Sequence, residues 1–231
     1  MENEAKLTEM NGRLRDLYEP YLQFIQSEFS SYSGKISLPL LMKITPSYFD
    51  ANFKILYVGK EIIENFGTLN EKRKFNTNFL MDAHGNFNLQ NSPHTPFWDF
   101  VHTINEKING DPYKGFTWTS FSKFSFNHNT PPVGIQNKNL RSFELLNHEI
   151  RVLQPDIVIF LTGFSYDEEF KHVFNNISYS PVIDNILYRV SHEDLPDNTL
   201  ITLHPKALIE RRISESLQAT IIREVPVAME S

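Results

Sequence analysis

Residues Phe143 to Gly163 read FELLNHEIRVLQPDIVIFLTG, and this stretch decides the fold class. The segment from Arg141 to Leu153, which overlaps its first part, repeats apolar residues at the spacing of one helical face. Pro155 ends the helix, because its ring cannot continue the hydrogen-bonding pattern. Asp156 to Leu161 follows as an apolar run, which is typical of a parallel strand buried on both faces. A helix followed directly by such a strand predicts an α/β domain.

The same alternation continues on both sides of this stretch. Apolar or aromatic runs predict further strands over residues 55–58, 116–126, 186–190 and 199–203. Helical spacing predicts helices over residues 97–108, 167–174 and 206–222. The expected architecture is a three-layer α/β sandwich, in which a central, mostly parallel sheet of roughly four strands is flanked by helices. Ligands of such sheets bind beyond the carboxyl ends of the strands.

Two segments lie outside this alternation. Residues 2–32 show helical spacing with Pro20 inside, which predicts a helix that is kinked or divided at the proline. We therefore expect residues 1–50 to form an N-terminal helical extension packed on a domain of residues 51–231. The segment from Asn65 to Pro96 is polar and shows no clear period, so we expect a long loop there.

Composition narrows the function classes. The 231 residues contain no cysteine, which excludes disulfides, thiol catalysis and thiolate metal sites. This fits a reducing compartment, and we expect a cytoplasmic protein. There is no run of about 18 apolar residues, so the sequence predicts no membrane span. A net charge of -6 counts against a purely electrostatic binder of nucleic acid.

Four segments carry a resemblance to a known family. They are ILYVGKE (Ile55 to Glu61), TWTSFSKF (Thr117 to Phe124), the stretch from Phe143 to Gly163, and LITLHPKAL (Leu200 to Leu208). In this order they resemble the motifs of the uracil-DNA glycosylase superfamily. The resemblance implies a DNA-repair hydrolase that flips a base out of DNA and cleaves its N-glycosidic bond. It also implies DNA as the partner, single-stranded or damaged, and no cofactor or metal.

The resemblance places two catalytic residues at strand ends. Glu61 matches the polar residue that stabilises the sugar cation or orients water, as carboxylates do in glycoside hydrolysis. His204 matches the donor that stabilises the departing base. Ser120 falls where the family typically has an asparagine that reads the base, and one hydroxyl cannot replace both the donor and the acceptor of an amide.

Further residues complete the implied site. Phe97 and Trp98 are candidates for stacking on the base, and the sequence does not choose between them. Leu208 falls where the family often places an apolar wedge that fills the gap left by the flipped base. Lys206, Arg211 and Arg212 are candidates for contacts with backbone phosphates. Pro205 is expected to be the first helical residue, where its missing N–H costs little.

Each of these residues also has an ordinary structural interpretation. Glu61 could face solvent or cap a helix, and His204 could be a capping or packing residue. Ser120 could be a plain strand residue; Phe97, Trp98 and Leu208 could be core, and the three cations a solvated helix face. Asp82, His84 and His94 could form a metal site, or simply belong to a polar loop.

Two other classes of function stay open. The chain could keep the fold without catalysis and bind nucleic acid or a protein partner, which the acidic balance and Ser120 favour. It could also be a small-molecule or nucleotide hydrolase on a similar sheet, because a fold does not fix a function.

Overall fold

The computed structural model describes residues 2–32, 35–60, 67–69, 75–127, 129, 131–164 and 166–225. The chain splits into two compact units, each built from several segments. Unit 1 comprises Met1–Thr45, Lys60–Phe87 and Thr119–Leu153, and unit 2 comprises Pro46–Gly59, Asn88–Trp118 and Gln154–Ser231. The segment expected as an N-terminal extension, residues 1–50, thus contributes residues to both units.

Helices occur in both units. The α-helices of unit 1 are α1 (Glu2–Glu28), α2 (Thr77–Gly85), α4 (Val133–Lys138) and α5 (Leu140–Leu153). Those of unit 2 are α3 (Pro96–Asn109), α6 (Asp167–Val173), α7 (Pro205–Glu210) and α8 (Ser214–Glu224). Short 3-10 helices cover Ser30–Tyr32, Pro46–Phe49 and Leu89–Asn91. Among the described residues, no helix combines the length and apolar character that crossing a membrane requires.

The strands form one mixed sheet in the order β2-β1-β3-β6-β5-β4. They are β1 (Ile55–Gly59), β2 (Phe116–Ser120), β3 (Ile157–Phe160), β4 (Ser178–Ile183), β5 (Leu187–Ser191) and β6 (Asn198–Thr202). β3 pairs in parallel with both β1 and β6, whereas β5 pairs antiparallel with β6 and with β4. The α/β class is therefore confirmed.

The sheet itself matches the expectation only in part, because it has six strands and an antiparallel side. The strand absent from the prediction is β4, which reads SYSPVI and has no buried residue. It contains Pro181, which is tolerated in an edge strand because no ladder hydrogen bond needs its missing N–H. Since β4 buries no face, its sequence has no apolar pattern that could mark it.

Strand register assigns each face of the sheet in unit 2 to different helices. Tyr57 pairs with Ile159, and Val58 pairs with Phe160, so the two pairs point to opposite faces. The ring of Phe160 contacts Phe170 of α6 at 4.9 Å between centroids. α6 therefore covers the face of Val58 and Phe160.

The opposite face of the sheet is covered by α3. The Phe116 ring meets Tyr57 edge-on at 5.5 Å, and Trp118, two residues further along β2, meets Trp98 of α3 at 5.1 Å. α3 in turn contacts α7 and α8. Aromatic rings thus pack on both faces of the sheet in unit 2.

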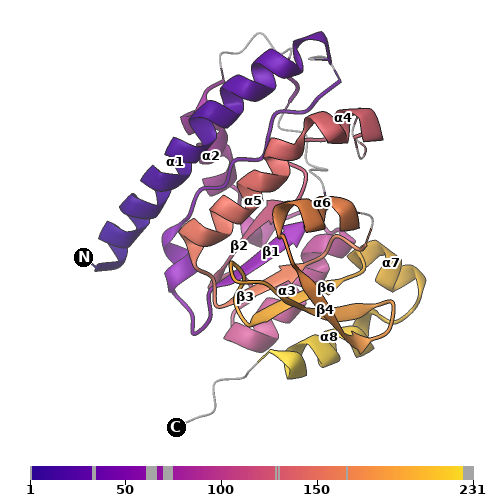
Figure 1. Cartoon of the computed structure of the whole chain (residues 1–231). Coiled ribbons are helices and arrows are strands. Elements are labelled where there is room, and N and C mark those ends of the chain that lie inside the picture. The colour runs from indigo at the N-terminus through magenta and orange to yellow at the C-terminus, as the bar shows by residue number, and fades with distance from the viewer. Residues whose placement is uncertain are drawn as a thin grey trace. The chain divides into compact units, whose positions relative to one another are not determined.

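Unit 1 is organised around α1, which packs on α5 and α2; Figure 1 shows α1 lying along α5. Its buried residues, Leu14, Tyr18, Tyr21, Leu22 and Ile25, recur at helical spacing. The helix runs through Pro20 without a break, so the expected division at the proline is wrong. Pro20 lies on the exposed side, where water can bond to the carbonyl that loses its partner.

Two further predictions differ from the structure. The polar segment from Asn65 to Pro96 contains α2, whose N-cap Asn76 accepts the backbone N–H of Phe79 at 2.9 Å. An asparagine that caps a helix is a sequence signal for the start of that helix. The segment shows no clear apolar period, so this helix was not predicted. The strand expected over residues 116–126 ends at Ser120, and residues 121–124 form a bend.

The single helix expected over residues 206–222 is also wrong. It is interrupted between α7 and α8, where Arg212 has a φ of 59°. A left-handed residue cannot continue a right-handed helix. In contrast, α3, α5, α6, β5 and β6 occur close to their predicted positions.

Candidate functional site

The end of β6 carries the histidine–proline motif. Pro205 is the first residue of α7, as expected, and His204 is its N-cap. The Nδ1 atom of His204 accepts the backbone N–H of Lys206 at 3.3 Å. A neutral imidazole that accepts through Nδ1 carries its proton on Nε2, which makes Nε2 a hydrogen-bond donor. The capping interpretation of His204 is therefore confirmed, and it is compatible with a donor role.

The loop after β3 lies beside His204. The backbone N–H of Gly163 donates to the carbonyl of Thr202 at 2.9 Å. A Cβ atom at Gly163 would meet the backbone nitrogen of His204 at an ordinary 3.9 Å, so space does not require glycine here. Its φ of +66° does, because L side chains rarely adopt that conformation. The carboxyl ends of β3 and β6 are thus joined at one place in unit 2.

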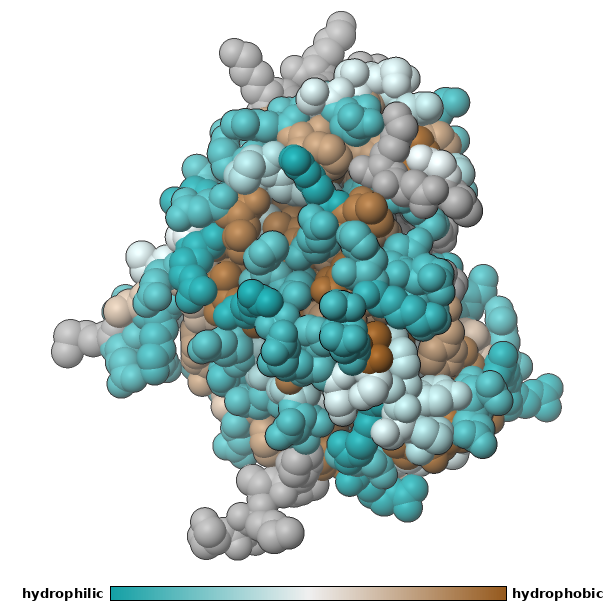
Figure 2. All heavy atoms as spheres, in the orientation of Figure 1, coloured by the Kyte–Doolittle hydropathy of each residue, from teal (hydrophilic) through white to brown (hydrophobic). Residues whose placement is uncertain are grey.

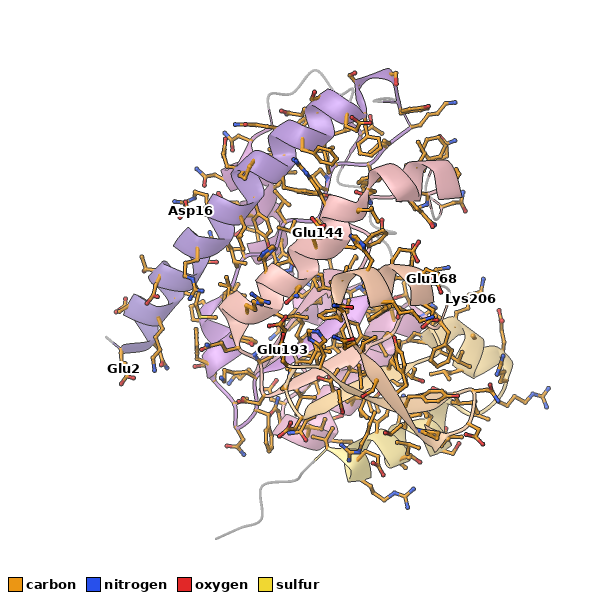
Figure 3. The ribbon with its side chains drawn as sticks, viewed as in Figure 1. Glu2, Asp16, Glu144, Glu168, Glu193 and Lys206 are labelled. Atoms are coloured by element: carbon orange, nitrogen blue, oxygen red, sulfur yellow. The ribbon has the colours of Figure 1, made fainter. Side chains whose placement is uncertain are left out.

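The segment from Lys206 to Arg212 exposes charged side chains and one apolar one. Lys206, Arg211 and Arg212 are all exposed, and Figure 3 labels Lys206 at the beginning of α7. Leu208 is fully buried, whereas the next residue, Ile209, is 52% exposed. The side chain of this helix that could enter a DNA stack is therefore Ile209 and not Leu208.

The two aromatic candidates lie in the first turn of α3. Trp98 is 3% exposed, with its ring edge-on to Trp118 and stacked on His102 at 5.7 Å. Phe97 is half-buried and meets Trp98 edge-on at 5.1 Å. The core interpretation therefore holds for Trp98, and Phe97 is the more accessible ring of the two.

The structure does not relate the remaining predicted site residues to this segment. Ser120 is the last residue of β2, is 5% exposed and belongs to unit 1. Glu61 lies outside the described residues. Within unit 2, the structure therefore groups His204 with Lys206, Arg211 and Arg212.

A buried polar cluster in unit 1 was not predicted. The Lys123 Nζ atom lies 2.5 Å from Glu149 Oε2 and 2.5 Å from Thr119 Oγ1. The Tyr18 hydroxyl donates to Glu149 Oε1 at 2.7 Å and accepts the backbone N–H of Met42 at 3.2 Å. We call Tyr18, Thr119, Lys123 and Glu149 the buried polar cluster. All four side chains are essentially inaccessible, so the cluster holds structure and does not meet a substrate.

Burial dominates the electrostatics of this cluster. It lowers the pKa of Lys123, while the neighbouring Glu149 carboxylate acts in the opposite direction. Burial also raises the pKa of Tyr18 well above its ordinary value, and Glu149 adds to that effect. One feature of the sequence could have indicated this cluster. Glu149, next to Ile150, lies on the apolar side of the α5 helix, where a charged residue needs a buried partner.

One group of residues has the spacing of a metal site in the described part of the chain. One ligand atom from each of His192, Glu193 and Asp194 lies within 4.8 Å of the others, and Figure 3 labels Glu193. The Nδ1 atom of His192 lies 3.8 Å from Asp194 Oδ2 and already accepts the backbone N–H of Asp194 at 3.1 Å. Exposed acidic residues commonly have this spacing without a metal.

Asp82, His84 and His94 do not belong to the group with metal-site spacing in the described part of the chain. Lys43 pairs with Asp82 at 2.6 Å, and its backbone N–H donates to Nδ1 of His84 at 3.2 Å. His94 belongs to unit 2 and lies 3.5 Å from Asp99.

Comparison with protein-family models finds no match, and comparison with curated proteins finds none either. The resemblance to the uracil-DNA glycosylase superfamily therefore rests on the sequence motifs.

Proposed function

We propose that the chain is a uracil-DNA glycosylase-like enzyme that hydrolyses the N-glycosidic bond of a damaged or deaminated base in DNA. The observation that supports this most is the geometry of His204. Its Nδ1 atom is held by the backbone of Lys206, so Nε2 keeps its proton and is fixed in direction. A fixed donor at a strand end can stabilise the negative charge that develops on a departing base.

The proposal assigns roles to the other residues. Glu61 stabilises the sugar cation or orients water, and Ser120 contacts the base. Lys206, Arg211 and Arg212 contact phosphates of the DNA backbone. We assign the apolar wedge to Ile209 in place of Leu208, because Leu208 is buried and Ile209 is exposed. A three-layer arrangement of helices around the mostly parallel part of the sheet, and a cytoplasmic location, belong to the same proposal.

The test is a glycosylase assay on labelled oligonucleotides that contain uracil, hypoxanthine or xanthine. Wild type is compared with Glu61→Gln, His204→Ala and His204→Asn. Removing one donor to a developing anion costs about 10²–10³ in rate, and we expect His204→Ala to lose at least that much. His204→Asn controls for the cap, since asparagine is a good N-cap residue. A folded wild type that excises none of these bases would refute the proposal.

A second candidate is a non-catalytic protein of this fold that binds nucleic acid or a protein partner. The buried Ser120, which replaces an amide, and the net charge of -6 favour it. In that case Glu61→Ala and His204→Ala would leave binding of single-stranded DNA unchanged.

A further inference from the structure

An aromatic ring is exposed directly after the carboxyl end of β3. Phe164 is 37% exposed, which is unusual for a phenylalanine. It follows Gly163, whose backbone is bonded to Thr202 and lies beside the backbone of His204. The ring therefore stands at the same strand ends as the proposed base-stabilising donor.

The ring has an aromatic neighbour among the described residues. Its edge meets Tyr188 of β5 at 5.3 Å between centroids. Tyr188 is itself held in place, because its hydroxyl accepts the backbone N–H of Asn185 at 2.9 Å. The turn around Asn185 is tied to β6 through the Thr202 hydroxyl, which donates to the carbonyl of Ile186 at 2.9 Å. Phe164 thus rests on a fixed aromatic neighbour while about a third of its surface stays exposed.

The charges on the neighbouring elements are of both signs. α6 begins with Asp167, Glu168 and Glu169, and Lys171 pairs with the first two at 2.6 and 3.0 Å. The segment from Lys206 to Arg212 carries three cations against Glu210. A site that recognises mainly phosphates shows one dominant positive field. Mixed charges around an exposed ring instead favour a ligand recognised by its planar face.

We propose that Phe164 is the stacking residue for a nucleobase at the carboxyl ends of β3 and β6. The choice of a nucleobase as ligand rests on the proposed function, whereas the site rests on the exposed ring, its support by Tyr188 and its neighbour His204. Every base has a π-face, so an aromatic platform binds bases with little dependence on phosphate. The ring completes what His204 lacks, namely a surface that orients the base.

The experiment measures binding of deoxyuridine and of 2-deoxyribose 5-phosphate by isothermal titration. Stacking of one base contributes about 1–3 kcal/mol by alanine substitution, equivalent to roughly 5- to 150-fold in affinity. We therefore expect Phe164→Ala to weaken deoxyuridine binding at least about fivefold. Phe164→Leu keeps the apolar bulk and should weaken binding similarly, whereas Phe164→Trp should retain it. Phe79→Ala is the matched control, because Phe79 is 45% exposed on α2 of unit 1.

Each outcome has a defined meaning. Equal affinity of wild type and Phe164→Ala, or no deoxyuridine binding by wild type, would overturn the inference. Preferential binding of the sugar phosphate would also overturn it. Binding that depends on Phe164 in a protein that excises no base would leave the inference standing and refute the proposed function. Base excision whose KM is unchanged by Phe164→Ala would support the proposed function and refute the inference about Phe164.

Discussion

The two units stabilise their interiors in different ways. Unit 1 buries an ion pair, Lys123 with Glu149, and supplies it with hydroxyl groups from Tyr18 and Thr119. Unit 2 places imidazoles against aromatic rings: His102 stacks on Trp98, and burial lowers the pKa of His102. The face of the molecule in Figure 2 is mainly hydrophilic, with apolar residues scattered among the polar ones.

The two interiors differ in the substitutions that they tolerate. A buried charge is held only while its partner remains, so the core of unit 1 depends on one specific pair. An aromatic core depends on shape and volume, and it excludes charge. In both units burial opposes the charged form and a carboxylate counters it, namely Glu149 for Lys123 and Asp99 for His102.

The largest expected effect comes from breaking the buried pair. Lys123→Met leaves the Glu149 carboxylate buried without its cation, and such changes destabilise proteins by about 3–5 kcal/mol. Glu149→Leu should cost a similar amount. The double variant Lys123→Met/Glu149→Leu should regain most of the loss, because no charge is then left unpaired. Urea unfolding followed by circular dichroism measures each free energy of unfolding.

An exposed pair in the same unit provides the control. Lys43 and Asp82 lie 2.6 Å apart with both side chains accessible, and exposed pairs contribute at most about 1 kcal/mol. If Lys123→Met cost no more than Lys43→Met, the buried cluster would not be what holds unit 1.

A smaller effect is expected within α7, where two neighbouring residues differ in burial. Leu208→Ala should destabilise the protein by about 2–5 kcal/mol, because it removes a fully buried side chain from unit 2. Ile209→Ala should change stability by less than about 0.5 kcal/mol, as surface substitutions usually do. If α7 enters a DNA stack, Ile209→Ala should nevertheless reduce base excision. The reverse pattern of stabilities would show that the wedge assignment is wrong.

The sequence predicted those elements whose burial is periodic. α3, α5 and β3 each bury a complete face or run, so their apolar residues mark them. β4 buries nothing and α2 begins in an asparagine-rich segment, so neither has such a pattern. The break after α7 depends on the left-handed backbone conformation of Arg212, and nothing in the sequence predicts that conformation for an arginine.

The candidate site was predictable to a similar extent. His204 and Pro205 follow a recognisable strand, so their place at its end could be inferred from local sequence. Lys123 and Glu149 are 26 residues apart, and only the fold brings their charges together. Phe164 was missed because a single aromatic residue in a loop gives no periodic signal, and its exposure depends on how β5 supports it.

The smallest expected effect is a pH dependence in unit 2. The His102 ring stacks on Trp98 and meets Tyr113 edge-on at 5.1 Å, and burial lowers its pKa from the ordinary value of 6.5. Asp99 opposes this shift and His94 adds to it. Between the folded-state pKa and 6.5 the unfolded chain binds more protons, so stability is complete above 6.5 and falls as the pH is lowered through that window.

We therefore expect His102→Phe to flatten the fall in unfolding free energy between pH 7 and pH 5. One proton limits the difference in slope to about 1.4 kcal/mol per pH unit, and only part of that range applies to a half-buried ring. His148→Gln, at an exposed position of α5 in unit 1, is the control and should leave the slope as in wild type. If both variants changed the slope equally, the aromatic rings around His102 would not be what disfavours the charged imidazole.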